Sequence, residues 1–264
     1  WIFRFLRDGT EERVRAKSDV METLNQNNVD LYRRHLAGTG REHLVTDSYY
    51  VHAFRNDHAG ILDTLQYALR LEKGADVEKI SADDLRDLEP DLARDFQMAV
   101  LVKGQARAIS PGAVCQALAE KFVRNGGTVV RQKVINLRKT DTNGWIVEAE
   151  GAALVADKIV VCAGAWSARL LRPLGFKIPL EAERGYHVEF EDAGVCLNNS
   201  VMDVDFGCVA SSMSDGLRLA GTAEFAPLDT PPIPARIEAL MKAAKNMLPD
   251  LNTADMTSWM GSRP

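Results

Sequence analysis

The stretch from Lys158 to Gly175 combines residue types that favour ligand binding with elements that could present them. Lys158–Cys162 is a short apolar run typical of a strand buried on both faces, and Trp166–Leu174 has apolar residues at helical spacing. Between them, Ala163-Gly164-Ala165 has almost no side-chain bulk, so a ligand can come close to the backbone. Ligands of α/β proteins bind at the carboxyl ends of strands. The stretch therefore predicts either a ligand site or a strand–helix joint that uses small residues for packing.

A hydrolase is a weaker interpretation of the same stretch. Gly164-Ala-Trp-Ser167 after a strand is similar to a nucleophile elbow, but that motif requires glycine two residues after the serine, where this chain has Arg169. A later histidine is also required, and His187, the only one after Ser167, falls in a predicted strand. We therefore disfavour a serine hydrolase, which would lose its activity in the variant Ser167→Ala.

Two predicted strands carry further side chains that could bind a small polar molecule. Tyr50 and His52 lie in Leu44–Phe54, and strand alternation sends both to one face. Tyr186 and His187 are neighbours, so they point to opposite faces and the four cannot all line one pocket. A tyrosine hydroxyl can hydrogen-bond a carboxylate while the ring packs against the ligand. The alternative is that each side chain simply lies on a half-exposed sheet.

Composition excludes several functions. The 264 residues are 46% hydrophobic and 26% charged, which is typical of a globular protein. A net charge of −5 provides no basic surface for nucleic acid, and no apolar run is long enough to cross a membrane. The basic residues near the start of the chain are diluted by acidic ones; a solvated helix face explains them better than a weak peripheral membrane contact. The four cysteines have no metal-ligand spacing, which indicates reduced thiols, no metal site and a cytoplasmic location.

The predicted elements fall into three stretches, and the fold class is α+β or α/β. Residues 1–109 begin with helices over Trp1–Leu36 and continue with the first strands, including a capping box at Ser81-Ala-Asp-Asp84. Residues 110–175 contain a helix, a strand over Thr128–Gln132, an antiparallel meander around the turn Asn143-Gly144, and the strand and helix described above. Residues 176–264 contain short strands and one helix.

Five short motifs occur in an order that resembles one flavoprotein family: the FAD-dependent amine and D-amino-acid oxidases and dehydrogenases, which include glycine oxidase and D-amino acid dehydrogenase. The motifs are Val160–Ser167, similar to the family's second flavin-contacting segment, Gly175–Pro179, Arg184-Gly185-Tyr186, Gly221-Thr222-Ala223-Glu224 and Trp259–Pro264. The resemblance covers nearly the whole chain. It implies part of a two-domain flavoprotein, with a discontinuous antiparallel-sheet substrate domain (1–109 and 176–264) and an incomplete FAD-binding domain with a β-meander (110–175).

The resemblance also implies the chemistry. The cofactor would be FAD, and the substrate an amino acid of the D-amino acid or glycine type. Hydride would pass directly from its α-carbon to the flavin, so no catalytic side chain is expected. The implied substrate-binding residues are Arg263, Tyr50, His52 and Tyr186. The implied cofactor-binding residues are Val134, Ala163, Gly164 and Trp166.

The chain departs from the family at its amino-terminal side. Gly38-Thr39-Gly40 is followed by His43 where a third glycine is required, and it follows a helix, so it is not the phosphate-binding fingerprint. The chain starts at Trp1 and stops at Arg263-Pro264, so we expect an internal piece of a longer enzyme that alone is inactive and holds FAD weakly. The electron acceptor is unknown. A non-catalytic binding or structural fragment is the remaining alternative.

Overall fold

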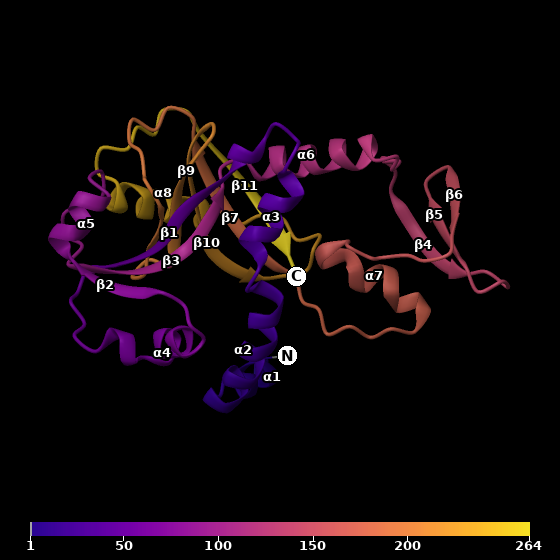
Figure 1. Cartoon of the computed structure of the whole chain (residues 1–264), viewed down its shortest axis with the longest axis horizontal. Helices are drawn as coiled ribbons and strands as arrows, with labels where there is room; N and C mark the ends of the chain where they lie inside the picture. Colours follow the sequence, from indigo (N-terminus) through magenta and orange to yellow (C-terminus); the bar gives the residue numbers. More distant parts are fainter. Residues whose placement is uncertain (1) are drawn as a thin grey trace.

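The centre of the molecule is an eight-stranded sheet with the order β11-β7-β10-β9-β8-β1-β3-β2 (Figure 1). The computed structural model describes residues 2–264, so Trp1, where the first predicted helix begins, lies outside it. Neighbouring strands are antiparallel except β1 and β8, which are parallel. The strands are β1 (Val45–Phe54), β2 (Val77–Ser81), β3 (Met98–Ala108), β7 (Glu183–Phe190), β8 (Ser200–Asp203), β9 (Cys208–Met213), β10 (Gly216–Phe225) and β11 (Met256–Arg263).

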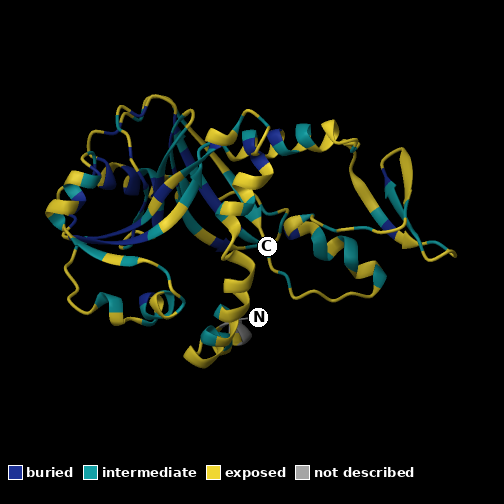
Figure 2. Ribbon diagram, in the orientation of Figure 1, coloured by how far each residue is buried: buried dark blue, intermediate teal, exposed yellow. Residues whose placement is uncertain are grey.

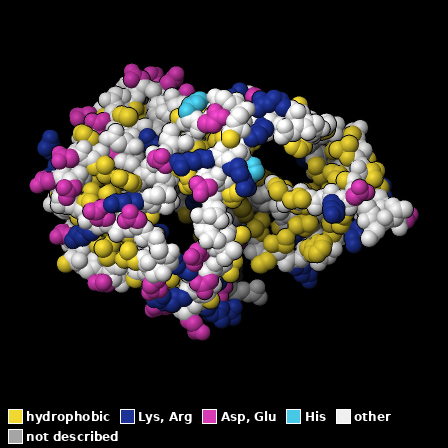
Figure 3. Space-filling view, in the orientation of Figure 1, with side chains coloured by type: hydrophobic (Ala, Val, Ile, Leu, Met, Phe, Trp, Pro, Cys, Tyr) yellow, Lys and Arg dark blue, Asp and Glu magenta, His cyan; other side chains and the backbone are white. Residues whose placement is uncertain are grey.

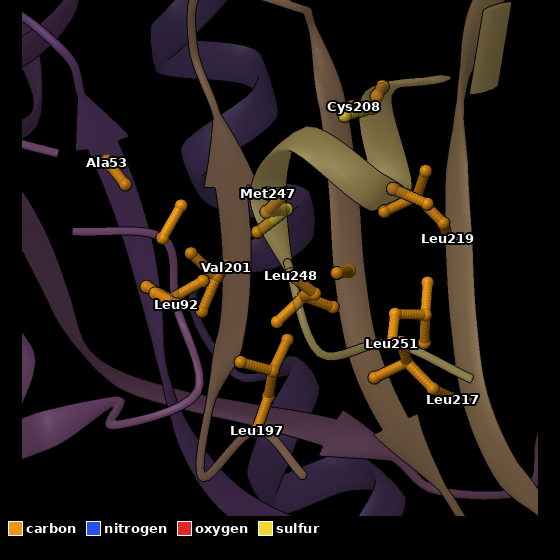
Figure 4. Close-up of a cluster of buried hydrophobic side chains, with 14 of the residues drawn as sticks. Ala53, Leu92, Leu197, Val201, Cys208, Leu217, Leu219, Met247, Leu248 and Leu251 are labelled. Carbon is orange, nitrogen blue, oxygen red and sulfur yellow. The ribbon is translucent and has the colours of Figure 1, made fainter. Parts of the chain in front are cut away.

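One face of this sheet carries the main hydrophobic core. Helices α5 (Ala82–Leu88) and α8 (Pro234–Met247) cover it, and side chains from alternate strand positions pack against them. Figure 4 shows part of this cluster, where Leu217 and Leu219 of β10 and Val201 of β8 lie beside Met247 and the residues that follow α8. One face of the central strands is therefore buried against these helices in the hydrophobic core.

A second lobe is built from the residues between β3 and β7. It contains a three-stranded antiparallel meander with the order β4-β5-β6, which extends away from the large sheet (Figure 1). Its elements are α6 (Pro111–Arg124), β4 (Val134–Lys139), β5 (Trp145–Ala149), β6 (Ala152–Ala156), η3 (Gly164–Trp166), α7 (Ser167–Leu171) and η4 (Arg172–Leu174). The large sheet thus takes its strands from the two stretches of sequence that flank the lobe.

The remaining helices precede or interrupt the first strands. They are α1 (Ile2–Asp8), α2 (Glu11–Asn25), α3 (Asn28–Leu36), η1 (Glu42–Leu44), η2 (Ile61–Asp63) and α4 (Leu65–Glu72). Helix α3 packs against α6, and α4 covers the outer end of the sheet near β2. No helix within residues 2–264 has both the length and the apolar character needed to cross a membrane.

Two predicted strands of the lobe are wrong. Thr128–Gln132 and Lys158–Cys162 have β-branched sequences, but neither segment forms a strand. A strand needs a neighbour for its backbone hydrogen bonds, and neither segment has one in this structure. Their side chains are accordingly uncovered, as for Val129 (60% exposed) and Val160 (85% exposed). Apolar side chains therefore gather on the surface of the lobe (Figures 2 and 3).

Candidate functional site

The face of the large sheet opposite the main core carries most of the candidate polar residues. Tyr50 and His52 alternate with the core residues Val51 and Ala53 along β1. On β7, His187 alternates with the core residues Tyr186 and Val188, so it lies on the same face as Tyr50 and His52. His187 pairs with Trp259 of β11, so Trp259 lies on this face as well.

The pairing of β7 with β11 sets up three consecutive cross-strand pairs on that face. Glu183 lies opposite Arg263, Gly185 opposite Gly261, and His187 opposite Trp259. An ion pair and an aromatic pair are therefore separated by two glycines. A Cβ added to Gly185 would lie 3.8 Å from Arg263 Cζ and 3.7 Å from His187 Nε2, so the guanidinium and the imidazole converge above this glycine.

Arg263 is held by the carboxylate opposite it. Its Nε donates a hydrogen bond to Glu183 Oε1 at 3.0 Å, and its Nη2 donates to the same oxygen. Nη1 lies towards Gly185, 3.9 Å from the position of an added Cβ. The Arg263 side chain is 63% exposed, so the guanidinium can meet a ligand from solvent. A planar guanidinium fixed at one edge is suited to binding a carboxylate at the other.

His187 is fixed by stacking. Its ring lies 3.7 Å from the Trp259 ring, with an interplanar angle of 8°. Burial, together with the nearby Arg218 and Arg263 and against an opposing effect of Glu189, lowers the pKa of His187 to about 4. The imidazole is therefore neutral near pH 7. Its Nδ1 is buried and has no hydrogen-bond partner within residues 2–264.

The structure separates Tyr50 and His52 from Arg263. Strands β1 and β11 are five positions apart in the sheet, which is roughly 24 Å along it at about 4.8 Å per strand. Tyr50 borders a pocket of about 300 Å³ together with Ser200 and Val209. His52 is only 2% exposed and its Nδ1 lies 2.6 Å from the Tyr67 hydroxyl. One small amino acid cannot contact these two residues and Arg263 together.

Tyr186 lies on the other face of the sheet. It is fully buried in the main core, its hydroxyl donates to Glu224 at 2.6 Å, and the Ile233 backbone N–H donates to that hydroxyl at 2.9 Å. Tyr186 and Glu224 therefore form a buried pair whose polar groups are hydrogen-bonded. The expectation that Tyr186 lines a substrate pocket therefore does not fit its position, and it is His187 that lies on the face with Arg263.

The buried position of His52 leads to a prediction about stability. Burial, with a smaller contribution from Arg70, lowers the pKa of its imidazole to about 4. Between that value and about 6.5 the unfolded chain binds more protons than the folded chain, so the free energy of unfolding falls as pH falls. We expect His52→Gln to flatten this dependence by roughly 2 kcal/mol between pH 7 and pH 4. Urea denaturation of both proteins across this range measures it; parallel pH profiles would contradict it.

The small-residue turn lies next to β11. Helix η3, which contains Gly164 and Trp166, packs against β11. Gly164 has φ = +52°, a conformation that favours glycine, and no atom lies within 4 Å of where its Cβ would be. Trp166 is 47% exposed. An open backbone beside an exposed indole fits the approach of a flat cofactor such as a flavin.

The other predicted cofactor contacts are accessible to different degrees. Ala163 immediately precedes η3 and is partly exposed. Val134 opens β4, is 37% exposed and belongs to the meander, whose first strand contacts α7. Helix α7 directly follows the turn at Ala163-Gly164, so it links this turn to the strand that Val134 opens.

Two residues of the site were not among the predicted contacts. Glu183 binds Arg263, and Trp259 stacks on His187. A signal was present in the sequence: Glu183, Gly185 and His187 alternate along one strand, and Trp259, Gly261 and Arg263 alternate along another. Only the register shows that the two series face each other. Among residues 2–264 there is no cluster of three His, Cys, Asp or Glu side chains that could hold a metal ion.

Comparison with known proteins gives a consistent result. The family model described as FAD dependent oxidoreductase (DAO) matches residues 4–264. A D-amino-acid oxidase from Bradyrhizobium diazoefficiens is 32% identical over 269 residues, and the match covers 100% of this chain and 64% of that protein. A glycine oxidase from Pseudomonas putida is 30% identical over 206 residues, covering 76% of this chain and 55% of that protein. The chain therefore spans less than two thirds of the length of these relatives.

Solved structures share the fold at low sequence identity. Glycine oxidase from Geobacillus kaustophilus superimposes with a TM-score of 0.73 at 20% identity, covering 97% of this chain and 68% of that one. L-proline dehydrogenase from P. horikoshii gives a TM-score of 0.74 at 15% identity, covering 90% and 65%. The predicted combination of a mostly antiparallel sheet with a meander-containing second lobe is confirmed as the architecture of these proteins.

Proposed function

Because the chain belongs to the FAD-dependent oxidoreductase (DAO) family, we propose that the protein containing it oxidises the amine of an amino acid. The observation that carries this proposal is the position of Arg263, a fixed and exposed guanidinium on β11, the strand that η3 with its open Gly164 contacts. One element binds a carboxylate and the other lies where a flavin can approach. Relatives named D-amino-acid oxidase and glycine oxidase support an amino acid of the D or glycine type.

The side chains in this site bind and orient the substrate. Arg263 would take the carboxylate, and Glu183 would keep the guanidinium in place, which positions the α-carbon. FAD, when bound, supplies the hydride acceptor. The amino acid loses a hydride from its α-carbon and a proton from its nitrogen, and water hydrolyses the resulting imino acid to a keto acid and ammonia. No side chain of this chain is required to form a covalent bond.

The two parts of the chain would bind different molecules. Residues 110–175 would contact FAD through Val134, Ala163, Gly164 and Trp166, and residues 1–109 and 176–264 would hold the substrate. Tyr50 and His52 would lie outside the carboxylate site, because four strands lie between their strand and β11.

We expect the 264-residue chain, expressed alone, to purify with far less than one FAD per chain. It lacks a G-x-G-x-x-G segment, whose helix amino terminus would bind the pyrophosphate, and the apolar surface of the lobe is uncovered. Absorbance at flavin wavelengths against protein concentration measures this ratio, with the complete gene product as the comparison. Tightly bound, stoichiometric FAD in the isolated chain would contradict the expectation.

The proposed reaction is tested by flavin bleaching in the complete gene product. Under anaerobic conditions we expect D-alanine, glycine or an N-methyl amino acid to bleach the flavin, and L-alanine to serve as the stereochemical comparison. A protein that holds FAD but is bleached by none of these amino acids would contradict amino acid oxidation. A complete gene product without flavin would instead favour the non-catalytic alternative.

A further inference from the structure

We infer that His187 donates a hydrogen bond from Nε2 to the substrate carboxylate, so that His187 and Arg263 together form a carboxylate clamp above Gly185. This inference rests on the proposed function, because it takes the ligand to be the carboxylate of an amino acid. It assigns a second binding group to that ligand and explains why a histidine stacks on Trp259 beside the arginine.

The geometry brings two donors to one place. An added Cβ on Gly185 would lie 3.9 Å from Arg263 Nη1 and 3.7 Å from His187 Nε2, so these nitrogens are at most about 7.6 Å apart. With N–H···O distances of about 2.9 Å, the two oxygens of one carboxylate can bridge that span. Both nitrogens belong to side chains on the same face of adjacent strands. The carboxylate would approach from the solvent side of the pair.

The hydrogen-bond partners of Arg263 leave the required donor free. Glu183 accepts from Nε and Nη2, which fixes the guanidinium along one edge. Among the described residues none accepts a hydrogen bond from Nη1, on the Gly185 side, so this nitrogen is available to the ligand. Glu183 is thus a positioning residue for Arg263, and the substrate would bind at the opposite edge of the guanidinium.

The surroundings of His187 determine which ring nitrogen carries the proton. Nδ1 is buried without a partner among the described residues, so a proton there would be a donor with no acceptor. A neutral ring therefore keeps its proton on Nε2, which faces the clamp. The ring is neutral near pH 7 because burial, Arg218 and Arg263 disfavour the imidazolium, and Glu189 offsets this only partly. Stacking against Trp259 fixes the ring plane, and with it the direction of Nε2–H.

The test is the affinity of propionate, a carboxylate without an amino group, measured by titration calorimetry on the complete gene product. We expect His187→Phe to weaken propionate binding by about 10-fold or more, because a hydrogen bond to a charged group is lost while the aromatic stack is kept. We expect His187→Gln to stay within a few-fold of wild type, since its amide N–H can donate from a similar position. His58→Phe, in an exposed loop, is the matched control and should bind propionate as wild type does.

The possible outcomes separate the clamp from the proposed reaction. If His187→Phe melts at the wild-type temperature and binds propionate equally well, His187 only packs on Trp259 and the inference is overturned. Absence of propionate binding to the wild-type protein would overturn it too. If propionate binds and depends on His187, but no amino acid bleaches the flavin, the clamp stands and the proposed oxidation fails. Should His187→Phe be unstable, retained affinity in His187→Gln together with loss in His187→Leu decides the question.

Discussion

Replacing Arg263 with alanine in the complete gene product should lower kcat/KM for its amino acid substrate by about 10²- to 10⁴-fold. Removing one partner of a hydrogen-bonded charge pair, here Arg263 and the substrate carboxylate, costs roughly 2–5 kcal/mol, and each 1.4 kcal/mol is a factor of ten. The variant also leaves Glu183 as an unpaired carboxylate beside the site, which adds electrostatic repulsion of the substrate. Anaerobic rapid-mixing measurements of flavin bleaching give both the rate and the apparent affinity.

Two further variants make the Arg263 measurement specific. Arg263→Lys keeps the charge but not the planar fork, so we expect an intermediate loss. Arg86→Ala removes an exposed arginine of α5, on the core side of the sheet, whose ion pair with Asp83 contributes little to stability. Arg86→Ala should keep wild-type kinetics. Equal activity of Arg263→Ala and Arg86→Ala would remove Arg263 from the proposed site.

Substituting Gly185 should separate activity from stability. A single Cβ there would sit in ordinary van der Waals contact with Arg263 and His187, so Gly185→Ala should stay within a few-fold of wild-type activity. Gly185→Val adds two methyl groups that reach into the guanidinium and the imidazole and must displace them. A displacement of about 1 Å in a binding group can cost about 10²-fold, which is the loss in kcat/KM that we expect.

The folded state should tolerate Gly185→Val, because the exposed Arg263 side chain can move towards solvent. We expect its free energy of unfolding, measured in urea, to stay within about 1 kcal/mol of wild type. Gly221 on the neighbouring strand is the contrast: an added Cβ would lie 3.0 Å from Cys208 Cβ and from Leu240 Cδ2 in the core. Gly221→Ala should therefore lose about 1–3 kcal/mol of stability. A Gly185→Val protein that unfolds like Gly221→Ala would show that Gly185 supports packing and not ligand access.

Features that depend on a few neighbouring residues could be predicted from the sequence. Ser81 and Asp84 form the expected capping box at the start of α5, and Asn143 adopts φ = +67° in the predicted turn between β4 and β5. Gly175 ends its helical stretch with φ = +86°. In each case local backbone geometry and side-chain hydrogen bonding decide the conformation, so distant residues change little.

Strand formation in the lobe could not be predicted in the same way. Lys158–Cys162 has the composition of a buried strand, but a strand exists only where a second strand accepts its hydrogen bonds. β2 was missed for the converse reason: Val77–Ser81 has little apolar alternation, and it becomes a strand because β3 lies beside it. The composition of a segment gives its tendency to form a strand, but the strand forms only where a neighbouring strand pairs with it.

The sequence by itself determined the alternation that puts Gly185 and His187 on one face of a strand, and Gly261 and Arg263 on one face of another. Only the tertiary structure decided that these two strands are neighbours in a register that sets Glu183 against Arg263. The same strand order places Tyr50 and His52 five strands away. Side-chain direction follows from the local backbone, but the distance between two strands depends on the pairing of the whole sheet, which no short segment encodes.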